Sequence, residues 1–366
     1  MTTRQLLLTP LLSALLLLTL LSSCETSGNK MKENADYTVV EGNTMGTYYR
    51  VTYKDVQDEN LKTVFDSALQ ALNMQVSTYI PESTISRFNQ ADSLYQLGTD
   101  PNTGNNTGYN NDHFIANYKK AREVFSKTDG FFDPTVMPLV NYWGFGYDEK
   151  KKITTVDSSK IDSLMRYIGM DHVELELYDE SEVLVKSNPG VKLDFSAIAK
   201  GYGVDLLGRI LAARGISNYL VDIGGETLAQ GMSPRGDAWK LGINYPNEEA
   251  GVQDIQTTVP LKDRALATSG NYRNFYEVDG VKYSHTINPK TGYPERNALL
   301  SASVFAPDCM TADAYATACM TLGPERAYDL IESIPNLEAY FIIGEEDGGM
   351  AVRYTPGLQS LFKTEQ

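Results

Sequence analysis

Histidine and cysteine are scarce in this chain of 366 residues, which contains three of each. The histidines His113, His172 and His285 are far apart in the sequence, which argues against a histidine-rich zinc site. No CxxC pair, HExxH motif or GxxxxGKS/T motif occurs. Cys309 and Cys319 are ten residues apart in a partly helical stretch. They could form a disulfide or remain two free thiols, and the sequence fits both alternatives.

Basic residues are also in short supply. The chain has 32 Lys and Arg against 47 Asp and Glu, a net charge of −15, and loss of Arg4 with an N-terminal leader would take the charge to −16. An acidic protein of this kind is not expected to bind nucleic acid. About 340 residues remain after such a leader, which is enough for one large domain or two modest ones.

Residues 1–23 have the features of a lipoprotein signal peptide. A leucine-rich run follows Arg4 and is too short and too interrupted for a membrane span. It ends in Leu21-Ser-Ser-Cys24, which resembles a lipobox, so Cys24 is the expected lipidated first residue. We expect an exported bacterial lipoprotein, anchored to a membrane on the periplasmic face of the envelope; the alternative is an ordinary signal peptide with a chance cysteine. The polar residues 24–36 are expected to form a flexible tether.

The first part of the mature chain, to about Glu149, mixes helices and strands. A strand pair is predicted at 37–41 and 47–53, and amphipathic helices at about 61–72 and 112–128. Pro81 breaks the segment after the first helix and leaves Tyr79 on a turn. Residues 92–112, rich in Asn, Gly and Thr, are predicted to form a loop without chemistry.

The stretch from Asp194 to Asp205 combines a predicted strand end with a predicted helix start. Apolar and β-branched residues at 191–195 indicate the strand, and helical spacing begins at Ala197. A helix start leaves backbone N–H groups unpaired and, with Lys200 in its first turn, favours a bound phosphate. A plain connection with Ser196 as cap and a solvated Lys200 fits the pattern equally well.

Two later stretches carry candidate chemistry. Tyr219–Glu226 indicates a buried strand stopped by a double glycine that closes a tight turn. His285 is expected at a strand end among Ser and Thr, where proton transfer is a candidate role beside a structural one.

The segment Met310–Met320 is strongly helix-forming, with Thr311 as the expected N-cap. Asp313 and Thr317 are four residues apart and therefore share one face, which is lined by alanines. A carboxylate and a hydroxyl in this position suit Mg²⁺, which takes few protein ligands and completes its octahedron with water and phosphate oxygens. An Asp placed for the helix dipole beside a buried Thr is the alternative.

Seven short motifs resemble those of the ApbE family, the bacterial FAD:protein FMN transferases. They occur in order: Gly-Asn-Thr-Met-Gly-Thr47, Asp-Pro-Thr135, Asp194-Phe-Ser-Ala-Ile-Ala-Lys-Gly201, Gly-Gly-Glu226, Ala-Thr-Ser-Gly-Asn-Tyr-Arg273, His-Thr-Ile-Asn-Pro289 and Ala-Asp-Ala-x-Ala-Thr317. The resemblance spans about residues 37–355, which it identifies as the folded domain, and leaves 356–366 as a C-terminal tail. The ordered series, rather than any one motif, makes the resemblance specific.

The resemblance implies a fold and a reaction. The fold is of the α/β, T-fold-like kind, with mixed sheets flanked by helices and FAD bound between two halves. The reaction is Mg²⁺-dependent transfer of FMN from FAD through a phosphoester to a Thr or Ser hydroxyl of a target protein, releasing AMP. As in the family, the acceptor would be a subunit of a sodium-pumping NADH:quinone oxidoreductase or of an Rnf-type complex.

The resemblance also assigns roles to individual residues. The FAD contacts are Met45, Tyr79, Phe131, Phe132, Asp133, Asp194, Lys200 and Ile287. The metal ligands are the side chains of Asp313 and Thr317 and the backbone oxygen of Ala197. His285 corresponds to a histidine implicated in the transfer step, and we expect it to act as the base.

Two other functions fit the same residues. With water in place of the protein hydroxyl, the same Mg²⁺ site would act as a pyrophosphatase that splits FAD into FMN and AMP. A non-catalytic lipoprotein that stores FAD would need Tyr79 and Lys200 but would have no use for the pair of Asp313 and Thr317.

Overall fold

The computed structural model describes most of the chain beyond the predicted leader and tether. The described ranges are 37–54, 60–99, 111–146, 153, 155–178, 181–246, 255–271, 275–278 and 281–362. The predicted signal peptide, the tether 24–36, Cys24 and Arg273 lie outside them. None of the helices in these ranges combines the length and the apolar character that a membrane crossing requires.

An eight-stranded sheet is the centre of the fold, and all of its neighbouring strands are antiparallel. The order across the sheet is β1-β2-β6-β7-β10-β13-β14-β15. The strands are β1 (Tyr37–Thr44), β2 (Thr47–Lys54), β6 (Tyr219–Ile223), β7 (Glu226–Gln230), β10 (Arg264–Gly270), β13 (Leu299–Ala306), β14 (Glu338–Gly344) and β15 (Met350–Tyr354). The α/β fold class expected from the sequence is confirmed, but the described sheets contain antiparallel strand pairs throughout and are not mixed.

Both faces of this sheet are covered, because side chains alternate between them along each strand. In β10, Ala265 and Ala267 face the main hydrophobic core and Leu266 faces a second core. In β14, Phe341 belongs to the main core and Tyr340 to the second.

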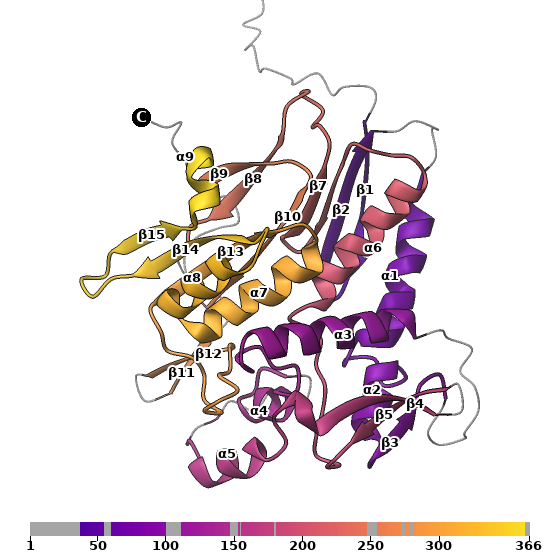
Figure 1. The fold of residues 1–366 in the computed structure, drawn as a ribbon, viewed down its shortest axis with the longest axis vertical. Coiled ribbons are helices and arrows are strands. Elements are labelled where there is room, and N and C mark those ends of the chain that lie inside the picture. The colour runs from indigo at the N-terminus through magenta and orange to yellow at the C-terminus, as the bar shows by residue number, and fades with distance from the viewer. Residues whose placement is uncertain are drawn as a thin grey trace, which may run out of the picture. The chain divides into compact units, whose positions relative to one another are not determined.

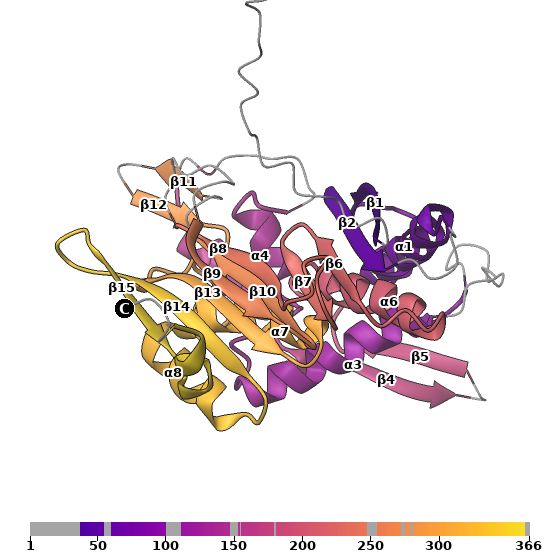
Figure 2. The ribbon, with the colours of Figure 1, turned by 90° about the horizontal axis from the view of Figure 1, so that it is seen from above.

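The main core is closed by helices, as Figures 1 and 2 show. These are α1 (Lys62–Val76), α3 (Asp112–Lys127), α6 (Ala199–Ala213), α7 (Cys309–Leu322) and α8 (Pro324–Ser333). The second core is closed by the hairpin of β8 (Trp239–Asn244) and β9 (Ile255–Leu261) together with the C-terminal η2 (Pro356–Leu358) and α9 (Gln359–Phe362). Helix α7 packs directly on β10 and β13, so its small residues fit against the middle of the sheet.

Smaller elements complete the domain. They are α2 (Thr84–Gln90), β3 (Leu94–Gln96), α4 (Met137–Tyr142), α5 (Ser158–Met165), η1 (Met170–His172), β4 (Val173–Tyr178), β5 (Ser181–Lys186), β11 (Phe275–Val278) and β12 (Val281–Ser284). A third hydrophobic cluster lies around Trp143, whose ring stacks on Tyr283 at 5.2 Å and whose Nε1 donates to the Gly292 carbonyl at 2.8 Å. This cluster fixes the segment that follows β12, which contains His285.

Several local predictions are confirmed. The strand pair at 37–53 is the β1–β2 hairpin, whose turn residues Met45 and Gly46 have φ angles of 50° and 73°, typical of a two-residue hairpin loop. The helix predicted at 112–128 is α3, and the double glycine closes the turn between β6 and β7.

Three local predictions are wrong. Residues 191–195 form no strand: the Asn89 side chain pairs with both backbone groups of Leu193, and the Asp194 N–H donates to Pro134. Helix α7 begins before Thr311, because Asp308 is the N-cap and accepts from the Thr311 N–H at 2.8 Å. The predicted loop 92–112 contains β3, whose Tyr95 is buried; its residues 100–110 lie outside the described ranges.

The described part of the predicted C-terminal tail is packed against the second core. Leu358 is fully buried, and the Phe362 ring lies 5.1 Å from Tyr340 and 5.0 Å from Tyr354. The folded domain therefore extends at least to Phe362, because Leu358 is buried and the Phe362 ring contacts β14 and β15.

Cys309 and Cys319 are both buried and unbonded. They lie on the same helix, where ten residues correspond to about 15 Å along the axis, beyond the reach of a disulfide. The free-thiol alternative therefore holds.

Helices α6 and α7 touch at Gly201, and this contact gives a testable prediction. A Cβ at Gly201 would lie 2.3 Å from the Cys309 carbonyl oxygen, which is backbone and cannot rotate away. We expect Gly201→Ala to lower the free energy of unfolding by about 2–3 kcal/mol, the usual cost of overpacking. Gly203→Ala on the same helix is the matched control, because its Cβ would meet only side-chain ends at 3.1–3.4 Å. Equal stability of the two variants in urea denaturation would contradict the prediction.

Candidate active site

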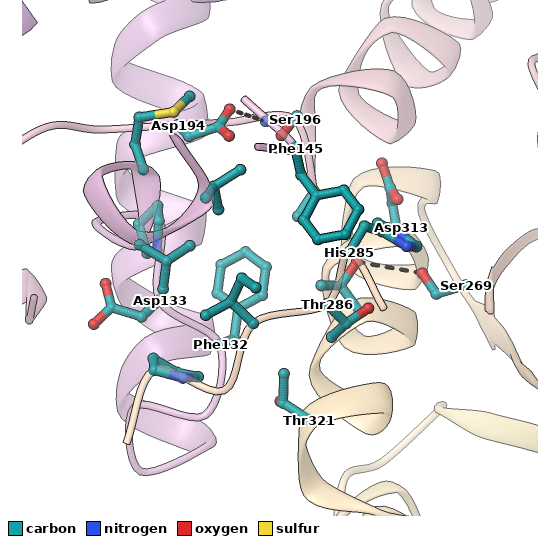
Figure 3. Close-up of a pocket in the computed structure, with 18 of the residues that line it drawn as sticks. Phe132, Asp133, Phe145, Asp194, Ser196, Ser269, His285, Thr286, Asp313 and Thr321 are labelled. Atoms are coloured by element: carbon teal, nitrogen blue, oxygen red, sulfur yellow. Dashed lines mark hydrogen bonds between the residues drawn. The ribbon is translucent and has the colours of Figure 1, made fainter. Parts of the chain in front are cut away.

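A cavity of about 390 Å³ lies where the ends of several elements meet. Its walls come from the turn after α1, the segment 131–137, the loop after α4, the start of α6, β7, the end of β10, the segment after β12, and α7. Figure 3 shows Phe145, His285 and Asp313 gathered on one side, with Phe132 and Asp133 on the other. Segments far apart in the sequence thus form one site.

All but one of the FAD-binding, metal-binding and catalytic residues predicted from the sequence line this cavity. They are Tyr79, Phe131, Phe132, Asp133, Asp194, Ala197, Lys200, His285, Ile287, Asp313 and Thr317. Met45 is the exception. It lies on the β1–β2 turn and lines a separate shallow hollow formed by residues 43–48.

Lys200 is paired inside the cavity with an acidic residue that sequence reasoning missed. Its Nζ lies 2.5 Å from Glu226 Oε1, and the Glu226 side chain is almost fully buried. The other oxygen of this carboxyl, Oε2, has no hydrogen-bond partner among the residues that the structure describes. Glu226 belongs to the Gly-Gly-Glu motif, of which sequence reasoning used only the glycines. The signal that could have identified it is the need of a partly buried Lys200 for a counter-charge.

Asp313 is the second buried carboxyl of the site, with 3 % of its surface exposed. Its Oδ2 accepts from the Gly201 N–H at 3.0 Å. Burial raises the pKa of Asp313, and burial also raises the pKa of Glu226 to about 7. Burial alone would lower the pKa of Lys200, but the carboxylates of Glu226 and Asp313 outweigh it and raise that pKa. Two carboxyls share one ammonium, so the ionised cluster carries a net negative charge.

The helix start is less open to an anion than the sequence suggests. The Ile198 and Ala199 N–H groups donate to the Phe195 carbonyl, and the Gly201 N–H donates to Asp313. The expectation of several unpaired N–H groups between Ala197 and Gly201 is therefore wrong at these three positions. The α6 dipole and Lys200 remain as the features of this end that favour negative charge.

The oxygen atoms around Asp313 suit a hard divalent cation. No group of three His, Cys, Asp or Glu side chains within the described ranges is placed to hold a metal ion, so a metal here would depend on other oxygen ligands. Thr317 lies one turn beyond Asp313 on α7 and its Oγ1 is 3.3 Å from Ser269 Oγ, while Ala197 lines the cavity just before α6. A buried carboxylate, a hydroxyl and a backbone oxygen fit Mg²⁺, which keeps several positions for water or phosphate.

His285 follows β12 and lines the cavity. The Phe145 ring lies edge-on to its imidazole, 6.4 Å between centroids. The neighbouring Thr286 donates to Asn271 Oδ1 at 2.6 Å, which fixes the backbone beside His285. Phe145, Ser269 and Thr286 all line the cavity and were not singled out from the sequence.

The opposite end of the cavity is aromatic. Two cations lie over the Phe131 ring: Arg326 Cζ is 4.1 Å and Lys290 Nζ is 5.7 Å from the ring centroid. Asp133 accepts from the Thr135 N–H at 2.8 Å and from its hydroxyl at 2.6 Å. Asp133 thus holds the turn that brings Phe131 and Phe132 into the cavity.

Asp133 gives a prediction about pH. Burial raises its pKa to about 6, so the folded protein binds a proton there more tightly than the unfolded chain does. Asp133 therefore adds stability that is fully present below its unfolded pKa near 4 and is lost as the pH rises through 6. Compared with Asp133→Asn, the wild-type protein should lose about 2–3 kcal/mol of unfolding free energy between pH 4 and pH 8.

Urea denaturation without FAD or metal measures this difference. Exposed Asp129, four residues earlier, is the matched control, since Asn also tolerates its φ of 50°. Parallel stability–pH curves for the wild type and Asp133→Asn would contradict the assignment.

Fold and site together define an α/β protein with an acidic, nucleotide-sized cavity beside a helix start. Residues 45–341 match the sequence profile of the ApbE family. The chain belongs to the ApbE family. A relative from Vibrio cholerae serotype O1, named FAD:protein FMN transferase, is 35 % identical over 92 % of this chain and 94 % of its own.

Two further comparisons agree. A protein of the same name from Escherichia coli strain K12 is 33 % identical over 88 % of this chain and 89 % of its own. The solved structure of flavin transferase ApbE from Vibrio cholerae superposes with a TM-score of 0.76 at 32 % identity, covering 89 % of this chain and 99 % of that one.

Proposed function

We propose that this chain, a transferase of the ApbE family, moves the FMN half of FAD to a Thr or Ser hydroxyl of a target protein and releases AMP. The observation that carries the proposal is the single cavity in which Asp313 and Thr317 on α7 face the start of α6 with Lys200. Relatives named FAD:protein FMN transferase over nearly their whole length support the same reaction. A cavity shared by an ammonium group and hard oxygen ligands suits a pyrophosphate better than an uncharged ligand.

The ligands of the proposed metal are Asp313, Thr317 and the Ala197 backbone oxygen. Mg²⁺ bound there would offset the negative charge on the pyrophosphate oxygens during transfer. The Gly201 N–H donates to Asp313 and orients its carboxylate. Lys200 adds a positive charge, and its ion pair with Glu226 sets the position of that charge. These contacts orient the groups before substrate arrives, so little reorganisation is needed.

His285 is the proposed base. The acceptor hydroxyl oxygen attacks the phosphorus of the FMN half, its proton passes to the imidazole, and the pyrophosphate P–O bond breaks to release AMP. The segment after β12 that contains His285 is fixed by the Trp143–Gly292 hydrogen bond and by the Thr286–Asn271 bond. A fixed base within the cavity is what proton transfer in a phosphoryl-type reaction requires.

The aromatic end of the cavity is the proposed contact for a flavin or adenine ring. Phe131 and Phe132 offer apolar surface, and exposed Tyr79 lies at the cavity wall. Asp194 at the same wall is oriented by the Ser196 N–H at 2.9 Å. A ring system at one end and a phosphate site at the other match the two chemical parts of FAD.

Incubation of the protein with FAD, Mg²⁺ and a candidate acceptor tests the proposal. A fluorescent protein adduct with stoichiometric AMP is the expected result. Free FMN with AMP would indicate a pyrophosphatase, and unchanged FAD would indicate a flavin-storage protein. Subunits of a sodium-pumping NADH:quinone oxidoreductase or of an Rnf-type complex are the proposed acceptors, met at a membrane to which Cys24 anchors the enzyme.

A further inference from the structure

Helices α6 and α7 are joined at their N-terminal ends by two carboxylates that point in opposite directions. Asp205 of α6 accepts from the Cys309 N–H at 2.8 Å and from the Met310 N–H at 2.9 Å, at the start of α7. Asp313 of α7 accepts from the Gly201 N–H, in the first turn of α6. Each helix thus receives a carboxylate from the other at the end where its dipole is positive.

The backbones of α6 and α7 are in close contact at Gly201. At Gly201 a Cβ would lie 2.3 Å from the Cys309 carbonyl oxygen and 2.8 Å from the Asp313 Cβ. The backbone of one helix therefore touches the backbone of the other. The relative position of the two helix starts is set by this contact and by the two carboxylates.

This position decides the geometry of the proposed metal site. Ala197 lies just before α6 and Lys200 in its first turn, whereas Asp313 and Thr317 lie on α7. A shift of α7 along α6 would change the separation of these donors, and Mg²⁺ demands near-ideal octahedral geometry. Asp205 does not line the cavity and is 8 % exposed, and its two hydrogen bonds go to the start of α7, so its effect on the site would be indirect.

Asp205 accepts from two N–H groups at the start of α7 that the N-cap of this helix does not pair with. The helix already has its own N-cap, Asp308, which accepts from the Thr311 N–H at 2.8 Å. Burial raises the pKa of Asp205 to about 7, which means that the surroundings disfavour its ionised form. Because this carboxylate comes from α6, its two hydrogen bonds form only when α6 and α7 keep their relative position.

We propose that Asp205 is a positioning residue for the metal site, fixing α7 on α6 so that Asp313 and Thr317 face Ala197 and Lys200 at the separation that a divalent cation needs. The inference rests on the proposed function. It assigns to Asp205 a role that is separate from substrate contact and that acts through the start of α7.

Asp205→Asn tests the inference, with Asp308→Asn as the matched control on the same helix end. Asparagine keeps one acceptor oxygen but replaces the other with a donor that faces an N–H group. We expect the dissociation constant for Mn²⁺, titrated by EPR with FAD present, to rise about 10-fold or more in Asp205→Asn, the range typical of outer-shell residues. Asp308→Asn should keep the melting temperature close to that of wild type, because Asn and Asp cap a helix about equally well, and should leave Mn²⁺ affinity within about 2-fold of wild type.

The outcomes separate this inference from the proposed function. If the wild type binds no Mn²⁺ with FAD and transfers no FMN, the proposed function fails. If the wild type does both and Asp205→Asn binds Mn²⁺ equally well, only the role of Asp205 is refuted. Should Asp205→Asn not fold, Asp205→Glu decides: it keeps both acceptor oxygens on a longer stem, and wild-type Mn²⁺ affinity in that variant would overturn the inference.

Discussion

The Asp313→Ala protein is expected to lose FMN transfer almost completely, by more than about 10³-fold, and to bind FAD more weakly when Mg²⁺ is present. Asp313 supplies the only carboxylate in the proposed ligand set, and it is buried beside a second carboxyl and one ammonium. Its removal takes away both the ligand and part of the negative charge that attracts the cation. Transfer rates and FAD titrations with and without Mg²⁺ measure the two effects.

Asp313→Asn refines this experiment. The amide oxygen still accepts from the Gly201 N–H, so the contact between α6 and α7 is kept while the charge is lost. If Asp313→Asn is as inactive as Asp313→Ala, charge and metal binding explain the effect. Asp313→Ala with normal turnover would remove the metal assignment.

The second large effect is expected for His285→Ala. FAD binding should be retained, and the transfer rate should fall by about 10²–10⁴-fold, the range for loss of a general base. The reason is that His285 faces the cavity beside Phe145 on a segment held by independent hydrogen bonds, so the cavity should survive the substitution.

His172→Ala is the control for that measurement. His172 lies in η1, does not line the cavity and pairs with Ser187 Oγ at 2.7 Å. Its substitution should leave both FAD binding and transfer unchanged. Loss of FAD binding in His285→Ala, with the remaining chemistry intact, would show that His285 is structural.

Glu226 and Asp205 are two buried carboxyls that would position the groups proposed to bind the pyrophosphate. Glu226 holds Lys200, and Asp205 holds the helix that presents Asp313. Burial raises the pKa of both carboxyls to about 7. Carboxyls with raised pKa values that lie in or beside a cavity are typical of functional sites, where orientation is favoured over stability.

The sequence by itself determined the features that depend on near neighbours in the chain. Alternation and the Met45-Gly46 turn specify the β1–β2 hairpin, and the spacing of four residues places Asp313 and Thr317 on one face of α7. The ordered motifs likewise identified the family, because each motif is a short local pattern. Local periodicity and turn chemistry are encoded within a few residues.

The tertiary structure alone decided which distant groups meet. Residues 191–195 have the composition of a strand, yet Asn89, about a hundred positions earlier, takes the backbone groups that a neighbouring strand would need. The pairing of Lys200 with Glu226 and the reach of Asp205 to the start of α7 depend on how helices and sheet pack. Met45 lies in a separate hollow for the same reason. Packing contacts of this kind have no local period, so no stretch of the chain encodes them by itself.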